Sequence, residues 1–238
     1  MILKKPKAII FDLDDTVYNY RETHKFALNA VKSKLKVEYG IPKKIFQQQY
    51  NLENLKIKKL LKNTASSHNK FLYFKNILES LKFSPYINTA VELENLYWEN
   101  FYDFMTPFDG LREFLEDIRL MNISVGIVTN FNSIYQFRKI LCLGFEDNID
   151  YLVSSEEVGS NKPNQKPFQK IIKLLDIKKS ENWMIGDSII NHIEPAKKIM
   201  NSITFLIETN EKNNKNNPCV DYTFNNYFFM KKILSKAK

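Results

Sequence analysis

Residues 8–16 read Ala-Ile-Ile-Phe-Asp-Leu-Asp-Asp-Thr, and this stretch decides the fold. Its first four residues form an unbroken apolar run, which is typical of a strand buried on both faces of a parallel sheet. The run stops at a group of carboxylates that begins with Asp12. Because open parallel sheets bind ligands beyond the carboxyl ends of their strands, the stretch predicts both a buried strand and the place of a binding site.

The same alternation of strand and helix continues along the chain. Further apolar runs predict strands at residues 124–128, 149–153, 183–185 and 203–207, and a short last strand at 222–224. Segments with apolar residues at helical spacing predict helices at 111–121, 167–175, 194–200 and 227–234. Such alternation implies right-handed crossovers, and the fold class it predicts is α/β, a Rossmann-like doubly wound parallel sheet.

A long insertion separates the first two predicted strands. Residues 18–105 contain no comparable apolar run, but they hold four segments rich in helix formers, at 24–39, 45–61, 69–81 and 90–104. We therefore expect an inserted helical domain at 18–105 and a Rossmann-like core built from 1–17 and 106–238. The one low-complexity segment, Asn210 to Asn217, is expected to be a surface loop.

Composition narrows the class of protein. The 238 residues are 44% hydrophobic, enough for a sizeable core, and 35 basic against 27 acidic residues give a net charge of +8. This charge suits an anionic partner, but the lysines are scattered and no nucleic-acid motif accompanies them, so we expect no nucleic-acid binding. The amino-terminal apolar run is too short for a signal peptide or a membrane span, which predicts a cytoplasmic protein without a membrane partner. Cys142 and Cys219 form no paired motif and are expected to be buried thiols.

Polar residues stand where the predicted strands end. They are Asp12, Asp14 and Thr16 after the first strand, Thr129 and Asn130 after the second, Lys162 in the loop after the third, and Asp187 after the fourth. A parallel sheet would gather all of them at one edge.

These residue types suit one reaction. A phosphate monoester repels an anionic nucleophile, so cations must neutralise its oxygens before a carboxylate can attack. Asp12 and Asp187 offer the hard oxygen ligands that Mg²⁺ prefers. Lys162 adds a fixed positive charge, and Thr129 can donate a hydrogen bond to the transferring oxygens. Asp14 can protonate the leaving alkoxide and later deprotonate the attacking water.

The four clusters, in this order, resemble the four motifs of the haloacid dehalogenase-like hydrolase superfamily. They are Asp12-Leu13-Asp14-Asp15-Thr16, Thr129-Asn130, Lys162-Pro163 and Gly186-Asp187-Ser188. The resemblance covers nearly the whole sheet domain. It implies that the insertion is a mobile helical cap, and it identifies Lys162 rather than Lys166 as the motif lysine.

The resemblance also implies roles for these residues. Asp12 would be the nucleophile that forms an aspartyl phosphate, with Asp14 and Lys162 as its catalytic partners. Thr129, Asn130 and Lys162 would bind the substrate phosphate. The Mg²⁺ would be held by Asp12, by the backbone carbonyl of Asp14 and by Asp187.

The chain departs from the family pattern at one point. A second aspartate usually follows four or five residues after the first in the fourth motif, and Asn191 and His192 stand there instead. In relatives that aspartate supports metal-bound water, so its absence should weaken metal binding. We predict that His192→Asp lowers the Mg²⁺ concentration needed for half-maximal activity.

The expected function is a phosphatase acting on a small phosphorylated metabolite. Asp14 argues against a dehalogenase, because displacement of halide needs no acid for the leaving group. A sugar phosphomutase and a non-catalytic ligand- or partner-binding homologue remain as alternatives. Specificity is expected to reside in the cap, where Arg21, His24, His68 and Lys70 are the candidates, and the protein is expected to be a monomer or a small homo-oligomer.

Overall fold

The computed structural model describes residues 3–84, 86–208 and 217–238. Two compact units make up the chain: Met1–Asn19 with Thr106–Lys238, and Tyr20–Met105. The first contains the sheet, and the second is entirely helical apart from its turns. Within the described residues no helix has the length and apolarity needed to cross a membrane.

The sheet has six strands in the order β3-β2-β1-β4-β5-β6, and every neighbouring pair is parallel. The strands are β1 (Ala8–Phe11), β2 (Ser124–Thr129), β3 (Tyr151–Ser154), β4 (Asn182–Gly186), β5 (Ile203–Ile207) and β6 (Tyr222–Phe224). This confirms the predicted α/β doubly wound parallel sheet. Because β1 lies between β2 and β4, chain order reverses at β1, which is where ligands bind in such sheets.

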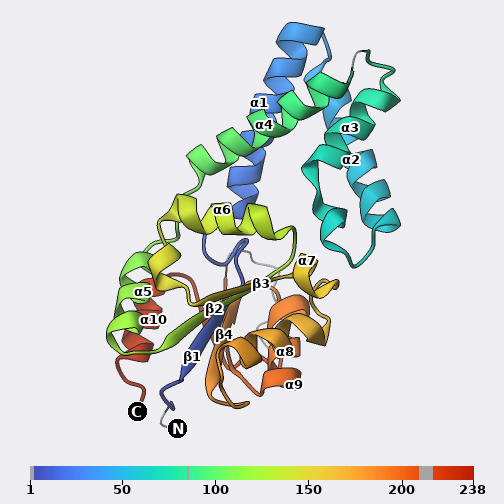
Figure 1. Cartoon of the computed structure of the whole chain (residues 1–238). Helices are drawn as coiled ribbons and strands as arrows, with labels where there is room; N and C mark the ends of the chain where they lie inside the picture. The colour runs from blue at the N-terminus through green and yellow to red at the C-terminus, as the bar shows by residue number, and fades with distance from the viewer. Residues whose placement is uncertain (1–2, 85, 209–216) are drawn as a thin grey trace. The chain divides into compact units, whose positions relative to one another are not determined.

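Helices cover both faces of the sheet (Figure 1). On one face α5 (Leu111–Leu120) packs beside α10 (Tyr227–Leu234), and on the other lie α8 (Gln165–Leu174) and α9 (Glu194–Met200). Two further helices, α6 (Ser133–Leu143) and the short α7 (Ser155–Val158), follow β2 and β3. The chain also has two 3₁₀ turns, η1 (Ala65–His68) and η2 (Glu146–Asn148), and a π-helical turn, η3 (Ile189–Ile193).

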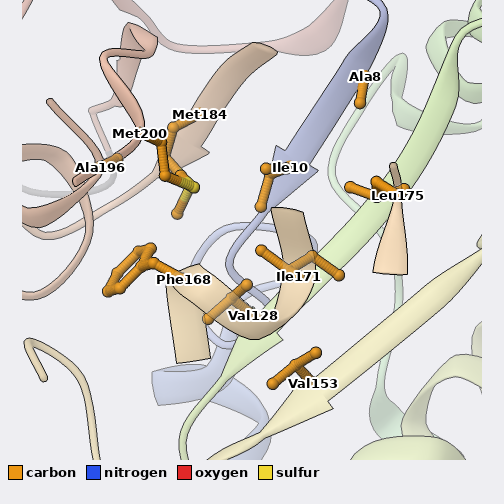
Figure 2. Packing of buried hydrophobic residues seen from close by; sticks show 10 residues of the cluster. All are labelled: Ala8, Ile10, Val128, Val153, Phe168, Ile171, Leu175, Met184, Ala196 and Met200. Carbon is orange, nitrogen blue, oxygen red and sulfur yellow. The ribbon is translucent and has the colours of Figure 1, made fainter. Parts of the chain in front are cut away.

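The core between the sheet and α8 and α9 is close-packed (Figure 2). Ile10 of β1, Val128 of β2 and Met184 of β4 meet Phe168 and Ile171 of α8, and all five side chains are fully buried. Gly126 leaves room for this packing, since a Cβ at that position would lie only 2.9 Å from the Ile171 side chain.

Element boundaries differ from the sequence expectation by a few residues. Helix α8 begins at Gln165 rather than at 167, because the Asn164 side chain accepts a hydrogen bond from the Lys166 N–H and caps the first turn. The expectation of buried thiols is wrong for Cys142, which is exposed on α6, and Cys219 is only partly buried. The outward side of α6 also carries Phe137 and Leu141, so apolar character did not signal burial there.

The helical unit consists of α1 (Tyr20–Tyr39), α2 (Lys43–Leu60), α3 (Lys70–Ser80) and α4 (Tyr86–Phe104). Its interior is largely aromatic, with Phe46, Phe74, Tyr97 and Phe101 fully buried. Tilted ring pairs connect α2, α3 and α4 through these side chains. The predicted surface loop at 210–217 lies, except for its last residue, outside the described residues.

Candidate active site

Asp12 stands directly beyond the central strand of the sheet. Its N–H continues the pairing of β1 with β4 by donating to Ile185 O at 2.9 Å, and its side chain is only 5% exposed. Thr129 ends β2 on one side, and Asp187 follows β4 on the other. The parallel register thus brings residues from three separate parts of the sequence to one edge of the sheet.

The Asp12 carboxylate is surrounded by donors and positive charge. It accepts a hydrogen bond from the Lys162 ammonium and another, of 3.2 Å, from the Thr16 hydroxyl. His192 Nε2 lies 3.5 Å from the same carboxylate. Burial alone would raise the pKa of Asp12, but His192 and Lys162 outweigh burial and hold that pKa below its ordinary value. The carboxylate is therefore ionised at neutral pH, as a nucleophile must be.

Lys162 is fixed at both ends. Its ammonium also donates to Val128 O at 2.6 Å, and its backbone N–H donates to Asn130 Oδ1 at 2.7 Å. The Asn130 side chain, which we expected to bind phosphate, is thus engaged in holding the loop that carries Lys162. Lys166 is exposed at the start of α8.

Thr129 is held by a residue that the sequence did not single out. The Gln136 amide donates to Thr129 Oγ1 at 2.5 Å and to Asn130 O at 2.9 Å, and the Gln136 side chain is fully buried. Gln136 lies one turn into α6, which begins at Ser133, shortly after Thr129-Asn130. Its place in the first turns of the helix that follows β2 was the signal that the sequence offered.

Asp14 is paired with a second residue that the sequence did not single out. Lys139, buried on α6, donates to Asp14 Oδ1 at 2.6 Å, and the Tyr18 hydroxyl donates to the same oxygen at 2.5 Å. Burial lowers the pKa of the Lys139 ammonium, and the neighbouring Asp14 carboxylate opposes that shift without cancelling it. Lys139 follows Gln136 by three positions, so both project from one side of α6 toward the site.

Three side chains form a cluster that suits a metal ion. Ligand atoms of Asp12, Asp187 and His192 lie within 4.8 Å of one another. Two carboxylates and an imidazole are a donor set that divalent cations accept, so these residues fit a divalent cation. The Asp14 side chain is not in this cluster, and its expected contribution to the metal, through its backbone carbonyl, stays a prediction.

The four candidates in the helical unit lie in different surroundings. His24 and Lys70 share an aromatic neighbourhood: the His24 ring stacks on Tyr20, and the Lys70 ammonium lies 6.0 Å from the centre of that same ring. Lys70 is only 6% exposed, whereas Arg21 lies on the surface. His68 is half-buried, and its carbonyl accepts a hydrogen bond from Lys70 at 3.3 Å.

A parallel α/β sheet that carries these four motifs at one edge defines a class of hydrolases. The chain belongs to the haloacid dehalogenase-like hydrolase family, whose model matches residues 9–205. The resemblance found in the sequence is thereby confirmed.

Characterised relatives are similar over most of the chain. A ribulose-1,5-bisphosphate 5-phosphatase of Halopiger xanaduensis is 30% identical over 193 residues, which cover 81% of this chain and 81% of that protein. A glyceraldehyde 3-phosphate phosphatase of Methanocaldococcus jannaschii is 27% identical over 235 residues, 98% of each chain.

Solved structures share the fold. A haloacid dehalogenase-like phosphatase from Thermococcus onnurineus superposes with a TM-score of 0.70 at 22% identity, covering 97% of this chain and 98% of the other. A 2-haloacid dehalogenase from Pseudomonas syringae gives a TM-score of 0.72 at 18% identity and covers 99% of both chains. Since phosphatase and dehalogenase superpose equally well, the fold alone does not distinguish the two reactions.

Proposed function

We propose that this chain is a phosphatase in which the Asp12 carboxylate attacks the phosphorus of a phosphomonoester and forms an aspartyl phosphate. The observation that carries the proposal is the surroundings of Asp12: a buried carboxylate beside an ammonium and an imidazole. Positive charge at this point keeps the nucleophile ionised and offsets the repulsion between it and a phosphate dianion. Family membership and the phosphatase relatives make the chain a phosphoric monoester hydrolase.

Asp14 supports phosphatase over dehalogenase chemistry. An alkoxide leaving group needs a proton, which a carboxylic acid can supply, and the water that later cleaves the aspartyl phosphate needs a base. Asp14 lies two residues after the nucleophile and is 30% exposed at its side chain, so it is open to substrate and water. The two donors on Asp14 Oδ1 leave its second oxygen available for proton transfer.

Thr129 and Lys162 would bind the transferring phosphoryl group. The Thr129 hydroxyl and the Lys162 ammonium come from the end of β2 and from the loop after α7. Fixed donors of this kind stabilise charge that develops in the transition state and need no reorganisation when it forms. Asn130 would act by holding the Lys162 loop.

A divalent cation, Mg²⁺ in most of this family, would be held by Asp12 and Asp187. When bound it would supply positive charge to the phosphoryl oxygens. The helical unit at 20–105 would act as the cap that excludes water and selects the substrate.

The substrate class we propose is a short phosphorylated carbohydrate. The relatives named above act on a five-carbon bisphosphate and a three-carbon phosphate, both small sugar phosphates. A panel of triose, tetrose, pentose and hexose phosphates, with phosphoglycolate as a non-carbohydrate comparison, tests this proposal. Preference for phosphoglycolate over every sugar phosphate would contradict the substrate class while leaving the phosphatase activity intact.

Hydrolysis of p-nitrophenyl phosphate by purified protein tests the reaction itself. Asp12→Asn is the matched control, since it keeps the size and a hydrogen-bonding oxygen while it removes the nucleophile. We expect a loss of at least about 10³-fold in that variant. Turnover by the wild type no faster than by Asp12→Asn, with Mg²⁺ or Mn²⁺ present, would favour a non-catalytic binding homologue instead.

A further inference from the structure

His192 takes the place where the family pattern has an aspartate, and its side chain points into the metal cluster. The imidazole is only 8% exposed. Its Nε2 lies 3.5 Å from Asp12 Oδ1, and its Nδ1 lies 3.1 Å from Asp187 Oδ1. One imidazole therefore lies between the two carboxylates that would hold the cation.

The backbone fixes this imidazole where it is. His192 lies in the turn η3, where its N–H donates to Ser188 O at 2.9 Å and its Nδ1 accepts a hydrogen bond of 3.2 Å from the Ser188 N–H. Gly186 makes room for the ring: a Cβ at that position would lie 2.6 Å from the Cβ of His192 and 2.9 Å from its Nδ1. A side chain this closely packed has little freedom to swing away when a cation binds.

The three side chains come close enough together to face one ion. Adjacent ligands about 2.1 Å from a metal lie about 3.0 Å apart, and opposite ligands about 4.2 Å apart. One ligand atom from each of Asp12, Asp187 and His192 lies within 4.8 Å of the other two, close to this range. Only one of the two imidazole nitrogens can bind a given ion.

We propose that an imidazole nitrogen of His192 is a ligand of the divalent cation, which turns an oxygen site typical of Mg²⁺ into a mixed nitrogen and oxygen site that prefers first-row transition-metal ions. Imidazole binds such ions far better than it binds Mg²⁺, which is hard and holds its waters tightly. The inference rests on the proposed function only for the location of the cation. It concerns which ion is bound and does not require that substrate turn over.

Mn²⁺ bound to the protein without substrate provides a direct test. Electron spin-echo modulation detects ¹⁴N bound to Mn²⁺, and we expect this signal in the wild type and its loss in His192→Asp. The chain has only three histidines, so His24→Gln and His68→Gln are matched controls that must keep the signal. Circular dichroism of each variant checks that the fold is retained.

A competition titration gives the second readout. The ratio of the Mg²⁺ to the Mn²⁺ dissociation constant should fall at least about tenfold in His192→Asp and in His192→Gln. Mn²⁺ binding without a ¹⁴N signal, or the same ratio in all variants, would overturn the proposal. If neither Mg²⁺ nor Mn²⁺ binds, the proposal that His192 is a metal ligand is overturned too. In that case, hydrolysis that persists in EDTA would show that the phosphatase proposal holds without a bound metal.

Discussion

Lys139→Met is the substitution that examines the acid–base role of Asp14 most directly. Lys139 Nζ donates to Asp14 Oδ1 at 2.6 Å, and the Lys139 side chain is 1% exposed. Methionine fills nearly the same volume and cannot donate. The Tyr18 hydroxyl would still donate to that oxygen, but the carboxylate would lose one of its two donors and the positive charge beside it.

The expected loss follows from the contact and its exposure. A hydrogen bond between charged groups contributes about 1.5–3 kcal/mol, and the lower value applies here because Asp14 is 30% exposed and water can replace part of the interaction. About 1.4 kcal/mol corresponds to a tenfold change in rate. We therefore expect kcat/KM for an alkyl phosphate to fall about tenfold in Lys139→Met.

Two substrates and a double-substitution cycle form the assay. An alkyl phosphate needs an acid at its leaving group, whereas p-nitrophenyl phosphate has a stable leaving group, so its kcat/KM should fall by less than about threefold. In an Asp14→Asn background, Lys139→Met should cause no further loss of kcat/KM. In the wild-type background, Lys139→Arg should keep more of the rate than Lys139→Met keeps. Equal losses on both substrates, or losses that add in the double variant, would refute the role of Lys139 through Asp14.

Three other perturbations follow from the same contacts. Gly186→Ala should lower the free energy of unfolding by about 1–3 kcal/mol in urea titrations, because the new Cβ would lie 2.6 Å from the His192 Cβ, and a His192→Gly background, which removes that Cβ, should relieve most of this cost. Burial, assisted by nearby lysines, lowers the pKa of His24 to about 3, so the folded protein binds this proton less readily than the unfolded chain, whose value is 6.5. The contribution of neutral His24 to stability is therefore complete above pH 6.5 and declines as the pH falls toward 3. Between pH 7 and 5, His24→Gln should lose less unfolding free energy than the wild type. Parallel curves of unfolding free energy against pH for the two proteins would contradict this. Gln136→Leu removes the hydrogen bond to Thr129 Oγ1 and should weaken inhibition by inorganic phosphate several-fold, whereas an unchanged inhibition constant would show that Thr129 needs no such support.

The strands and the order of the site residues could be read from the chain. Ala8 to Phe11 is apolar because β1 is buried on both faces. A strand of that kind has no polar positions, so its apolar run is easily recognised in the sequence. In a parallel sheet every strand ends at the same edge, so Asp12, Thr129 and Asp187 could be placed together before their distances were known. The helices of the insertion were equally visible. Their starts were less exact, since α1 begins four residues before the predicted start at His24, whereas α3 begins one residue after its predicted start at 69.

Tertiary structure alone decided which partners those residues have. Lys139 and Asp14 are 125 positions apart, and no local pattern distinguishes a lysine buried against a carboxylate from one on the surface of α6. The sequence showed that His192 replaces an aspartate and predicted only weaker metal binding. The structure places its imidazole between Asp12 and Asp187, because the turn η3 and the missing Cβ of Gly186 direct the ring there. Residue type determined what chemistry was available, and packing determined which groups meet.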